Sequence, residues 1–494
     1  MKLIMVGKSV FTYFITEDKV LIPELSMRKK IGKYTILIDD NTPFSCASNG
    51  RIECAIYGIA VNVLSGQRDK IVDEIVNTCT CIDDVVEYER YLGGKYILLY
   101  KCNEQYFMQG DATCSIPIFY NIEGGFVCSS NYNYIVNVKN YCVDRKFSLI
   151  RESGDISQAM PYDITPYKDI KQLIPNHYLN INQQSAERFI NSKYKQREIS
   201  IQEATETVLP MIENILNLYQ STYKIYCPIT AGRDSRVVLS FLKNNKNDFS
   251  CYTIKHPEHS ARSQDIVIPS ELCKRVNVTY RLIEDVVVTD SLKSEFDNLL
   301  GIDGYSLRTL QIAYTINKYF GDGAIINGDI IGQVGKCSLH RDIPIFFAKP
   351  SYFQCKLHNY SKDAKLHLKN WIKEIEISGE KINLFDLFSI ENRMGRWAGQ
   401  ENLIYNSLGQ VYLNIFNCRK IIYTWTAVER RIRKNSMLHI DIIQKKCKEL
   451  LDISFEKEES FVHTISKANG ITYLVASYMK YYIEKLKYQK GRRI

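Results

Sequence analysis

Apolar positions in the first part of the chain fall into short runs separated by Gly, Asn and Asp. These runs predict β-strands at Lys33–Ile38, Arg51–Val63, Lys95–Lys101, Tyr106–Met108, Ile116–Asn121 and Gly125–Ser129. Two stretches of helical character, Asp69–Cys79 and Asp83–Leu92, interrupt the strands. Strands, hairpins and helices mixed in this way predict an α+β domain built in layers.

The pattern changes after the polar stretch Asn191–Glu203. Apolar residues at a spacing of three and four predict a helix over Glu203–Tyr219. Beyond it, strands at Tyr223–Ile229, Phe249–Ile254 and Val278–Ile283 alternate with helices at Arg236–Leu242 and Gln264–Val276. This alternation predicts a parallel, doubly wound α/β sheet. From Glu295 the chain reads as mostly helical, with one strand at Ala324–Asn327. We therefore expect two domains, residues 1–195 and 196–494, with the boundary uncertain by about ten residues.

Composition narrows the class of protein. Of the 494 residues, 45% are hydrophobic and 24% charged, which excludes a wholly disordered, collagen-like or coiled-coil protein. Lys+Arg exceed Asp+Glu by 64 − 55 = 9, a mildly basic balance that falls short of a dedicated nucleic-acid binder.

The sequence also sets an expectation for the compartment. It contains no run of ~18 apolar residues, and its start lacks the features of a signal peptide. Its 15 cysteines form no CxxC pairs, which favours buried, reduced thiols over zinc sites or disulfides. We expect a cytoplasmic protein with no membrane partner.

The most informative segment is Thr230-Ala231-Gly232-Arg233-Asp234-Ser235, between a predicted strand and a predicted helix. The first N–H groups of such a helix form an anion site, and Ala231 and Gly232 allow close approach of a phosphate. Thr230 and Ser235 offer hydroxyls, and Asp234 offers a carboxylate for Mg²⁺. An ordinary strand–turn–helix corner is the alternative. The Walker lysine motif does not match.

This segment resembles the S-G-G-x-D-S pyrophosphate loop of the ATP pyrophosphatase (PP-loop) superfamily, with Thr230 for Ser and Ala231 for Gly. The resemblance implies ATP and Mg²⁺ as cofactors, with all six loop residues at the nucleotide. It also implies cleavage between the α and β phosphates and adenylation of a substrate.

Other stretches resemble the asparagine synthetase family, which includes the β-lactam synthetases. Gly110-Asp111 through Tyr120, followed by Phe126–Ser130, is similar to its G-D-x-x-G-x-x-P-L-Y-Y and F-A-S-E strands. Cys251–Ile254 resembles the strand whose backbone meets adenine, which implies a nucleotide contact at Ile254. Ser263-Gln264-Asp265 resembles the following S-x-D segment. The resemblance implies an Ntn-hydrolase-like first domain, a PP-loop second domain and a helical C-terminal part.

Two further residues carry weaker matches. Gly328-Asp329-Ile330-Ile331-Gly332-Gln333 stands where the family has G-E-G-x-D-E, which implies that Asp329 assists deprotonation of an attacking amine. The family's later metal-binding Asp falls on Gly332, so Asp329 is also a candidate Mg²⁺ ligand, and simple turn capping is the alternative. Lys457 matches a lysine at the acyl-adenylate, where its charge offsets that of the α-phosphate. A solvated surface lysine is its alternative reading.

The family's glutaminase nucleophile is absent. That nucleophile is a cysteine at position 2, whereas this chain has Lys2 and its first cysteine is Cys46. We therefore expect a degenerate glutaminase domain. The amine then comes from the substrate itself, from free ammonia or from a partner protein.

Two other sequence features admit two interpretations each. Arg393 and Arg396 flank Met394-Gly395 and suit either a clamp on an anionic substrate or arginines packed against the neighbouring Trp397. The tail Lys480–Arg493 suits either contact with nucleic acid or a solvated amphipathic helix.

The expected function is an ATP-dependent amide-bond-forming ligase that adenylates a small-molecule or peptide carboxylate, which ammonia or an amine then attacks. A nucleic-acid partner is not expected, and a homodimer is left open. The alternatives are a tRNA-modifying PP-loop enzyme and a catalytically inactive relative that serves as a binding protein.

Overall fold

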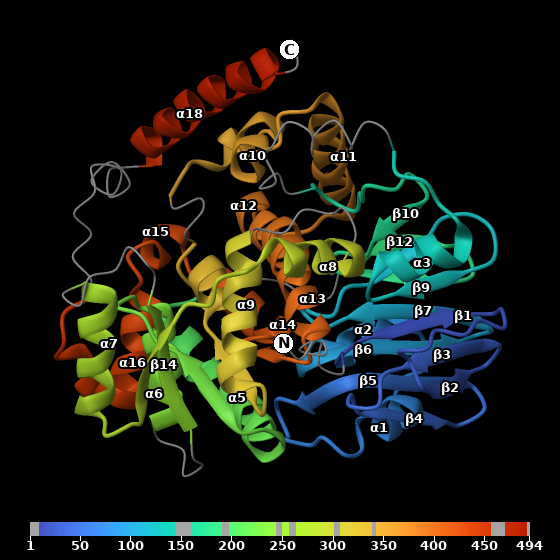
Figure 1. The fold of residues 1–494 in the computed structure, drawn as a ribbon, viewed down its shortest axis with the longest axis horizontal. Coiled ribbons are helices and arrows are strands. Elements are labelled where there is room, and N and C mark those ends of the chain that lie inside the picture. The colour runs from blue at the N-terminus through green and yellow to red at the C-terminus, as the bar shows by residue number, and fades with distance from the viewer. Residues whose placement is uncertain are drawn as a thin grey trace.

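The computed structural model describes residues 9–144, 160–189, 197–243, 249–255, 263–300, 307–337, 342–455 and 470–491. Within them the chain is mixed α/β, with two antiparallel sheets in its first half and one parallel sheet in its second (Figure 1). None of its described helices is long and apolar enough to span a bilayer. No disulfide joins any of its fifteen cysteines.

Each antiparallel sheet has six strands. One sheet has the order β10-β8-β9-β1-β3-β2, with β1 Tyr13–Thr16, β2 Met27–Ile31, β3 Tyr34–Ile38, β8 Phe119–Asn121, β9 Val127–Ser129 and β10 Ile170–Gln172. The other has the order β12-β11-β7-β6-β5-β4, with β4 Phe44–Ser48, β5 Ile52–Asn62, β6 Leu92–Cys102, β7 Gln105–Gly110, β11 His177–Asn180 and β12 Ser185–Arg188.

The two antiparallel sheets face each other and carry helices on their outer faces. In β1, Tyr13 and Ile15 point into the core between the sheets, whereas Phe14 packs toward α3 (Tyr132–Lys139). The outer face of the second sheet packs on α1 (Ile71–Thr78) and α2 (Ile82–Glu89). Burial on both faces explains why these strands appear in the sequence as continuous apolar runs.

The parallel sheet has the order β15-β14-β13-β16-β17. Its strands are β13 Ile225–Pro228, β14 Phe249–Lys255, β15 Tyr280–Glu284, β16 Ala324–Asn327 and β17 Val411–Asn414. All four neighbouring pairs are parallel, which confirms the doubly wound arrangement expected from the alternation of strands and helices.

Helices cover both faces of the parallel sheet. Cys227 and Ile326 pack on the face covered by α5 (Ile201–Thr222), α6 (Asp234–Lys243), α7 (Gln264–Arg275) and α16 (Met437–Cys447). Tyr226 and Ile325 pack on the opposite face, under α8 (Asp290–Leu300), α9 (Leu307–Phe320) and α13 (Gly399–Ser407). The other helical elements are η1 Ile331–Gly335, η2 Ile345–Phe347, α10 Pro350–Leu357, α11 Lys362–Ser378, α12 Leu384–Leu387, η3 Phe388–Ala398, α14 Arg419–Thr426, α15 Arg430–Arg433, η4 Lys448–Leu451 and α18 Gly470–Gly491.

Several predicted bounds need correction. The helix expected over Asp83–Leu92 ends at Glu89, and Leu92 already belongs to β6. The strand expected over Ile116–Asn121 covers only Phe119–Asn121, and Asp111 accepts from the N–H groups of Thr113 and Ser115 in the turn that precedes it.

Buried polar contacts join the two halves of the chain. Lys95 Nζ donates to Asn402 Oδ1 and Asn406 Oδ1 at 2.8 and 2.9 Å. Arg188 forms a two-pronged ion pair with Glu391 at 2.7 and 2.8 Å, in which both side chains are buried. The expected boundary near residue 195 lies partly outside the described residues and stays a prediction.

Candidate active site

The candidate site lies where the strand order of the parallel sheet reverses, between β13 and β16. From β13 the chain builds β14 and β15 on one side, then returns to place β16 and β17 on the other. In open parallel sheets, the crevice at the carboxyl ends of the strands at such a switch point is the usual ligand site. The loops after β13 and β16 meet there: a Cβ added to Gly328 would lie 2.8 Å from the Asp234 carbonyl oxygen.

The loop after β13 is open to a ligand. Thr230 is exposed, and a Cβ added to Gly232 would meet only the Thr230 hydroxyl, at 3.3 Å. The Thr230 N–H donates to Ser235 Oγ at 3.1 Å, so the two hydroxyls lie side by side at the start of α6. The first N–H groups of α6 have no partner within the helix and carry its positive end. The loop therefore has the space and the polarity that a phosphate requires.

Residues behind the loop fix its shape. The Ala231 N–H donates to Asp265 Oδ1 at 3.2 Å. The buried guanidinium of Arg236 donates to the carbonyl oxygens of Leu450 and Ile453 at 2.9 and 2.7 Å, and lies over the ring of Phe455. These contacts hold the loop rigidly from behind while its outer face stays accessible.

Asp234 begins α6 and is held by a histidine. Its Oδ1 lies 2.7 Å from Nε2 of His439, a fully buried residue of α16, while the Asp234 side chain itself is 39% exposed. His439 Nδ1 is buried without a hydrogen-bond partner in the described structure. Burial acts to raise the pKa of Asp234, but the hydrogen bond and charge of His439, followed by the charges of Lys336 and Arg233, lower it below its ordinary value.

Gly332 lies against the carboxylate of Asp234. A Cβ at position 332 would lie 2.5 Å from Asp234 Oδ2. The carboxylate of Asp234 therefore occupies the space that a side chain at position 332 would need.

Two further acids lie near this loop: Asp329 feels the charge of Asp234, and Glu401 feels the charge of Asp329. Burial, reinforced by the charge of Asp234, raises the pKa of Asp329 to about 6, although Tyr412 and Arg393 act in the opposite direction. Burial and the charge of Asp329 raise the pKa of Glu401, on α13, to about 8, against a hydrogen bond from Thr309 at 3.0 Å. Shifted acids in a cleft are typical of functional sites.

The donor set suits a magnesium ion. Asp234 and Asp329 present carboxylates from facing loops, and their mutual repulsion is what a divalent cation relieves. Among the residues that the structure describes, no group of three or more His, Cys, Asp or Glu side chains could hold a metal by itself. An ion here would take its remaining oxygens from a bound ligand and from water.

The structure brings most of the predicted site residues together. Thr230–Ser235 and Asp329 share the switch-point crevice, and Ile254 lies near the carboxyl end of the adjacent strand β14. Lys457 lies outside the described residues. Of the two arginines, Arg393 acts on Asp329 and Glu401, whereas buried Arg396 donates to the carbonyl oxygens of Met160 and Ile164.

Sequence reasoning missed His439 and Glu401. His439 is separated from Asp234 by 205 positions, and no motif spacing connects them. Glu401 belongs to a helix whose apolar pattern gives it no special place. Only the fold brings these two side chains to the crevice.

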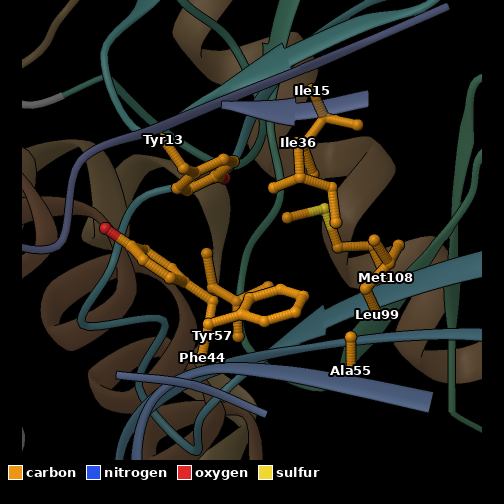
Figure 2. Close-up of a pocket in the computed structure, with 9 residues that line it drawn as sticks. Tyr13, Ile15, Ile36, Phe44, Ala55, Tyr57, Leu99 and Met108 are labelled. Carbon is orange, nitrogen blue, oxygen red and sulfur yellow. The ribbon is translucent and has the colours of Figure 1, made fainter. Parts of the chain in front are cut away.

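The space between the antiparallel sheets has a different character. It holds a cavity of about 10 Å³, lined by apolar and aromatic side chains that include Tyr13, Ile36, Tyr57, Leu99 and Met108 (Figure 2). One water needs at least that volume and polar partners as well. An amino-acid substrate does not fit there.

No family model matches the chain, and no curated protein matches it in sequence. Among solved structures, the glutamine-dependent NAD+ synthetase from Acinetobacter baumannii in complex with ADP aligns at 9% identity, covering 49% of this chain and 62% of that one, with a TM-score of 0.21. The allosteric regulatory enzyme of purine biosynthesis aligns at 12% identity over 65% of this chain and 69% of that one, with a TM-score of 0.23. The U34-tRNA thiolase NcsA from Methanococcus maripaludis with its [4Fe-4S] cluster aligns at 12% over 54% and 91%, with a TM-score of 0.22. TM-scores this low do not establish a shared fold.

Proposed function

We propose that this chain is an ATP-dependent ligase that activates a substrate carboxylate as an acyl-adenylate and joins it to ammonia or an amine. One observation carries the proposal. An open, small-residue loop at the switch point of a parallel sheet meets a second loop, and each contributes one acid, Asp234 and Asp329.

The nucleotide is bound by its phosphates. The N-terminus of α6 and the hydroxyls of Thr230 and Ser235 hold the β and γ phosphates, and Gly232 leaves space for them. Mg²⁺ held by Asp234 and Asp329 would neutralise charge on the departing pyrophosphate. The backbone at Ile254 is the proposed adenine contact, because β14 ends at the same edge of the sheet.

The reaction proceeds in two steps. A substrate carboxylate oxygen attacks the α-phosphorus, and pyrophosphate leaves. The amine then attacks the acyl carbon, AMP leaves, and the nitrogen loses a proton. Glu401, whose pKa is raised to about 8, is suited to accept that proton near neutral pH. This assignment leaves Asp329 for the metal. Lys457 stays the proposed contact of the acyl-adenylate.

The first half does not supply ammonia from glutamine in this proposal. The apolar cavity between the sheets, of about 10 Å³, is too small for glutamine. The amine is therefore part of a substrate or reaches the site as ammonia from solution or from a partner protein.

ATP–pyrophosphate exchange tests the proposal, because exchange requires adenylation. Purified full-length protein is assayed with ATP, Mg²⁺ and a panel of carboxylic acids. We expect exchange with at least one acid, and a loss of at least a hundredfold, about 2.7 kcal/mol, in Asp234→Ala. Asp322→Ala is the matched control. Asp322 is exposed and lies just before β16, at the opposite end of that strand from Asp329. It accepts hydrogen bonds from Lys224 and Tyr226.

Three outcomes contradict the proposal. Equal exchange in wild type and Asp234→Ala removes Asp234 from the mechanism. ATP binding without exchange for any acid supports an inactive relative that serves as a binding protein. Co-purified tRNA that becomes modified in the presence of ATP supports the tRNA-modifying alternative.

A further inference from the structure

The last helix, α18, lies along the outer edge of the molecule, beyond α10 (Figure 1). One side of it is fixed to the body. Lys356 of α10 donates to Tyr473 Oη at 3.0 Å and to Ser477 Oγ at 3.3 Å. Tyr481 packs edge-on against Tyr360, with ring centroids 5.4 Å apart. These contacts set which face of α18 points away from the protein.

That outward face is apolar. Six large side chains on it are 53–62% exposed: Ile471, Val475, Met479, Tyr482, Ile483 and Leu486. Their spacing of three and four places them on one stripe of the helix. They make up a third of the eighteen large hydrophobic side chains exposed in the described structure, although α18 has only 22 residues. Such a concentration marks an interaction surface rather than ordinary surface variation.

The charge of this region is strongly one-sided. Residues 470–494 contain six cations, Lys480, Lys485, Lys487, Lys490, Arg492 and Arg493, and one acid, Glu484. Their net charge of 6 − 1 = 5 is more than half of the chain's total of +9. At ~100° per residue, the stripe covers about 120° of the helix, and Lys480 and Lys485 follow within roughly 60° of its two edges. The apolar stripe is thus bordered by positive charge.

Three kinds of partner can be compared with this surface. A second copy would cover the stripe but would bring a second charge of +5 against the first. A nucleic acid would satisfy the charge but leave the stripe in water. A bilayer of anionic phospholipid satisfies both, because the apolar stripe enters the acyl boundary while the flanking lysines stay among the headgroups.

We propose that α18 docks this protein on an anionic phospholipid surface, lying in the plane of the interface. This role is independent of the ligase activity proposed above. It departs from the expectation of no membrane partner, for which the lack of an apolar run of ~18 residues was one reason. A helix that lies on a membrane needs no such segment.

Co-sedimentation of the full-length protein with vesicles tests this proposal. The vesicles contain phosphatidylcholine alone, or phosphatidylcholine with about one third phosphatidylglycerol. We expect at least tenfold tighter binding to the anionic vesicles, weakened by added salt. The double variant Met479→Glu/Ile483→Glu is expected to reduce that binding at least tenfold. Ile377→Glu, at a 76% exposed position of α11, is the matched control and is expected to bind as wild type does.

A second variant keeps the test valid if Met479→Glu/Ile483→Glu fails to fold. Lys480→Glu/Lys485→Glu keeps the stripe intact and is expected to lower anionic binding at least tenfold, with an unchanged circular-dichroism spectrum. Equal binding of wild type and both double variants would overturn the proposal. So would a concentration-dependent dimer in ultracentrifugation that Met479→Glu disrupts, or RNA binding, if either occurs without vesicle binding.

Discussion

The gap between the antiparallel sheets and the carboxyl edge of the parallel sheet both contain buried acids, but the two regions treat them differently. In the sandwich, Asp39 accepts from the Thr12 N–H at 2.9 Å and from the hydroxyls of Thr42 and Tyr57. At the parallel edge, burial and the charge of Asp234 raise the pKa of Asp329, and burial and the charge of Asp329 raise the pKa of Glu401. The carboxylate of Asp39 is satisfied by donors, whereas Asp329 and Glu401 face like charge that Tyr412, Thr309 and Arg393 offset only in part.

The surroundings of the acids distinguish a structural region from a candidate ligand site more clearly than burial does. The sandwich fills its remaining space with apolar side chains and leaves a cavity of about 10 Å³ (Figure 2). The parallel edge keeps open space over Gly232 and tolerates electrostatic repulsion nearby. Repulsion between carboxylates destabilises the empty site, and a bound ligand can relieve it. The ligand proposed here is a cation with a nucleotide.

The largest expected effect comes from one pair of glycine substitutions, which tests this contrast directly. Gly58 of β5 has φ +118°, and a Cβ there would overlap the Lys95 backbone carbonyl. We expect Gly58→Ala to lower the free energy of unfolding by about 3 kcal/mol, because neither the backbone conformation nor the neighbouring strand can adjust. In Gly332→Ala, the three atoms nearest the new methyl group all belong to the Asp234 carboxylate, which can turn aside. We expect this variant to keep its stability within about 1 kcal/mol and to lose exchange activity roughly thirtyfold.

Urea unfolding and pyrophosphate exchange measure the two effects on the same preparations. If Gly332→Ala unfolds as easily as Gly58→Ala while its folded fraction exchanges normally, the parallel edge is structural and the contrast fails.

The parts of the fold that local pattern encodes were predictable from the sequence. Buried strands such as β5, β6 and β14 appear as apolar runs, and the bounds expected for β16 match the structure. β2 was missed because this strand, MRKKI, alternates half-buried and exposed residues and carries lysines. β17 was missed because it is four residues long and lies among helices.

The candidate site divides in the same way. A contiguous loop, Thr230–Ser235, can be read directly because one turn holds most of the chemistry. His439 and Glu401 act through contacts between distant segments, and a single sequence carries no signal for those. The contrast between the arginines, with Arg393 facing the acids and Arg396 bonded to backbone carbonyls, likewise depends on tertiary packing.

A smaller effect is expected at His439, which positions Asp234 in this account. His439→Leu removes the donor to Asp234 Oδ1, so the carboxylate is no longer held toward the metal. We expect the Mg²⁺ concentration for half-maximal exchange to rise about tenfold, as is typical when the partner of a metal ligand is lost. His439→Gln, which retains an N–H donor at a similar reach, is expected to restore most of the response. Mn²⁺ binding followed by electron paramagnetic resonance gives a readout independent of activity.

The matched control is His177, a buried histidine of the first half that bonds Glu374 at 2.9 Å. His177→Leu is expected to lower stability without changing the Mg²⁺ requirement. An unchanged requirement in His439→Leu as well would show that Asp234 needs no support, and would weaken the assignment of this carboxylate to the metal.

The smallest effect is expected from the pH dependence of stability at Glu401. Its pKa is about 8 in the folded chain, against an ordinary value of 4.5, so the folded state binds more protons than the unfolded state between these values. Stability from this group is therefore present below about pH 4.5 and is lost as the pH rises toward 8. Glu401→Gln cannot ionise, so in the absence of divalent cations we expect its stability to match that of wild type near pH 5 and to exceed it near pH 8. Denaturant unfolding at a series of pH values measures the difference in stability.

Mg²⁺ with ATP should reduce this difference, because a cation beside Asp329 offsets the charge that Glu401 faces. If the stability difference between Glu401→Gln and wild type does not change with pH, Glu401 is ionised in the folded chain. The acids at the parallel edge would then be as well compensated as Asp39 in the sandwich.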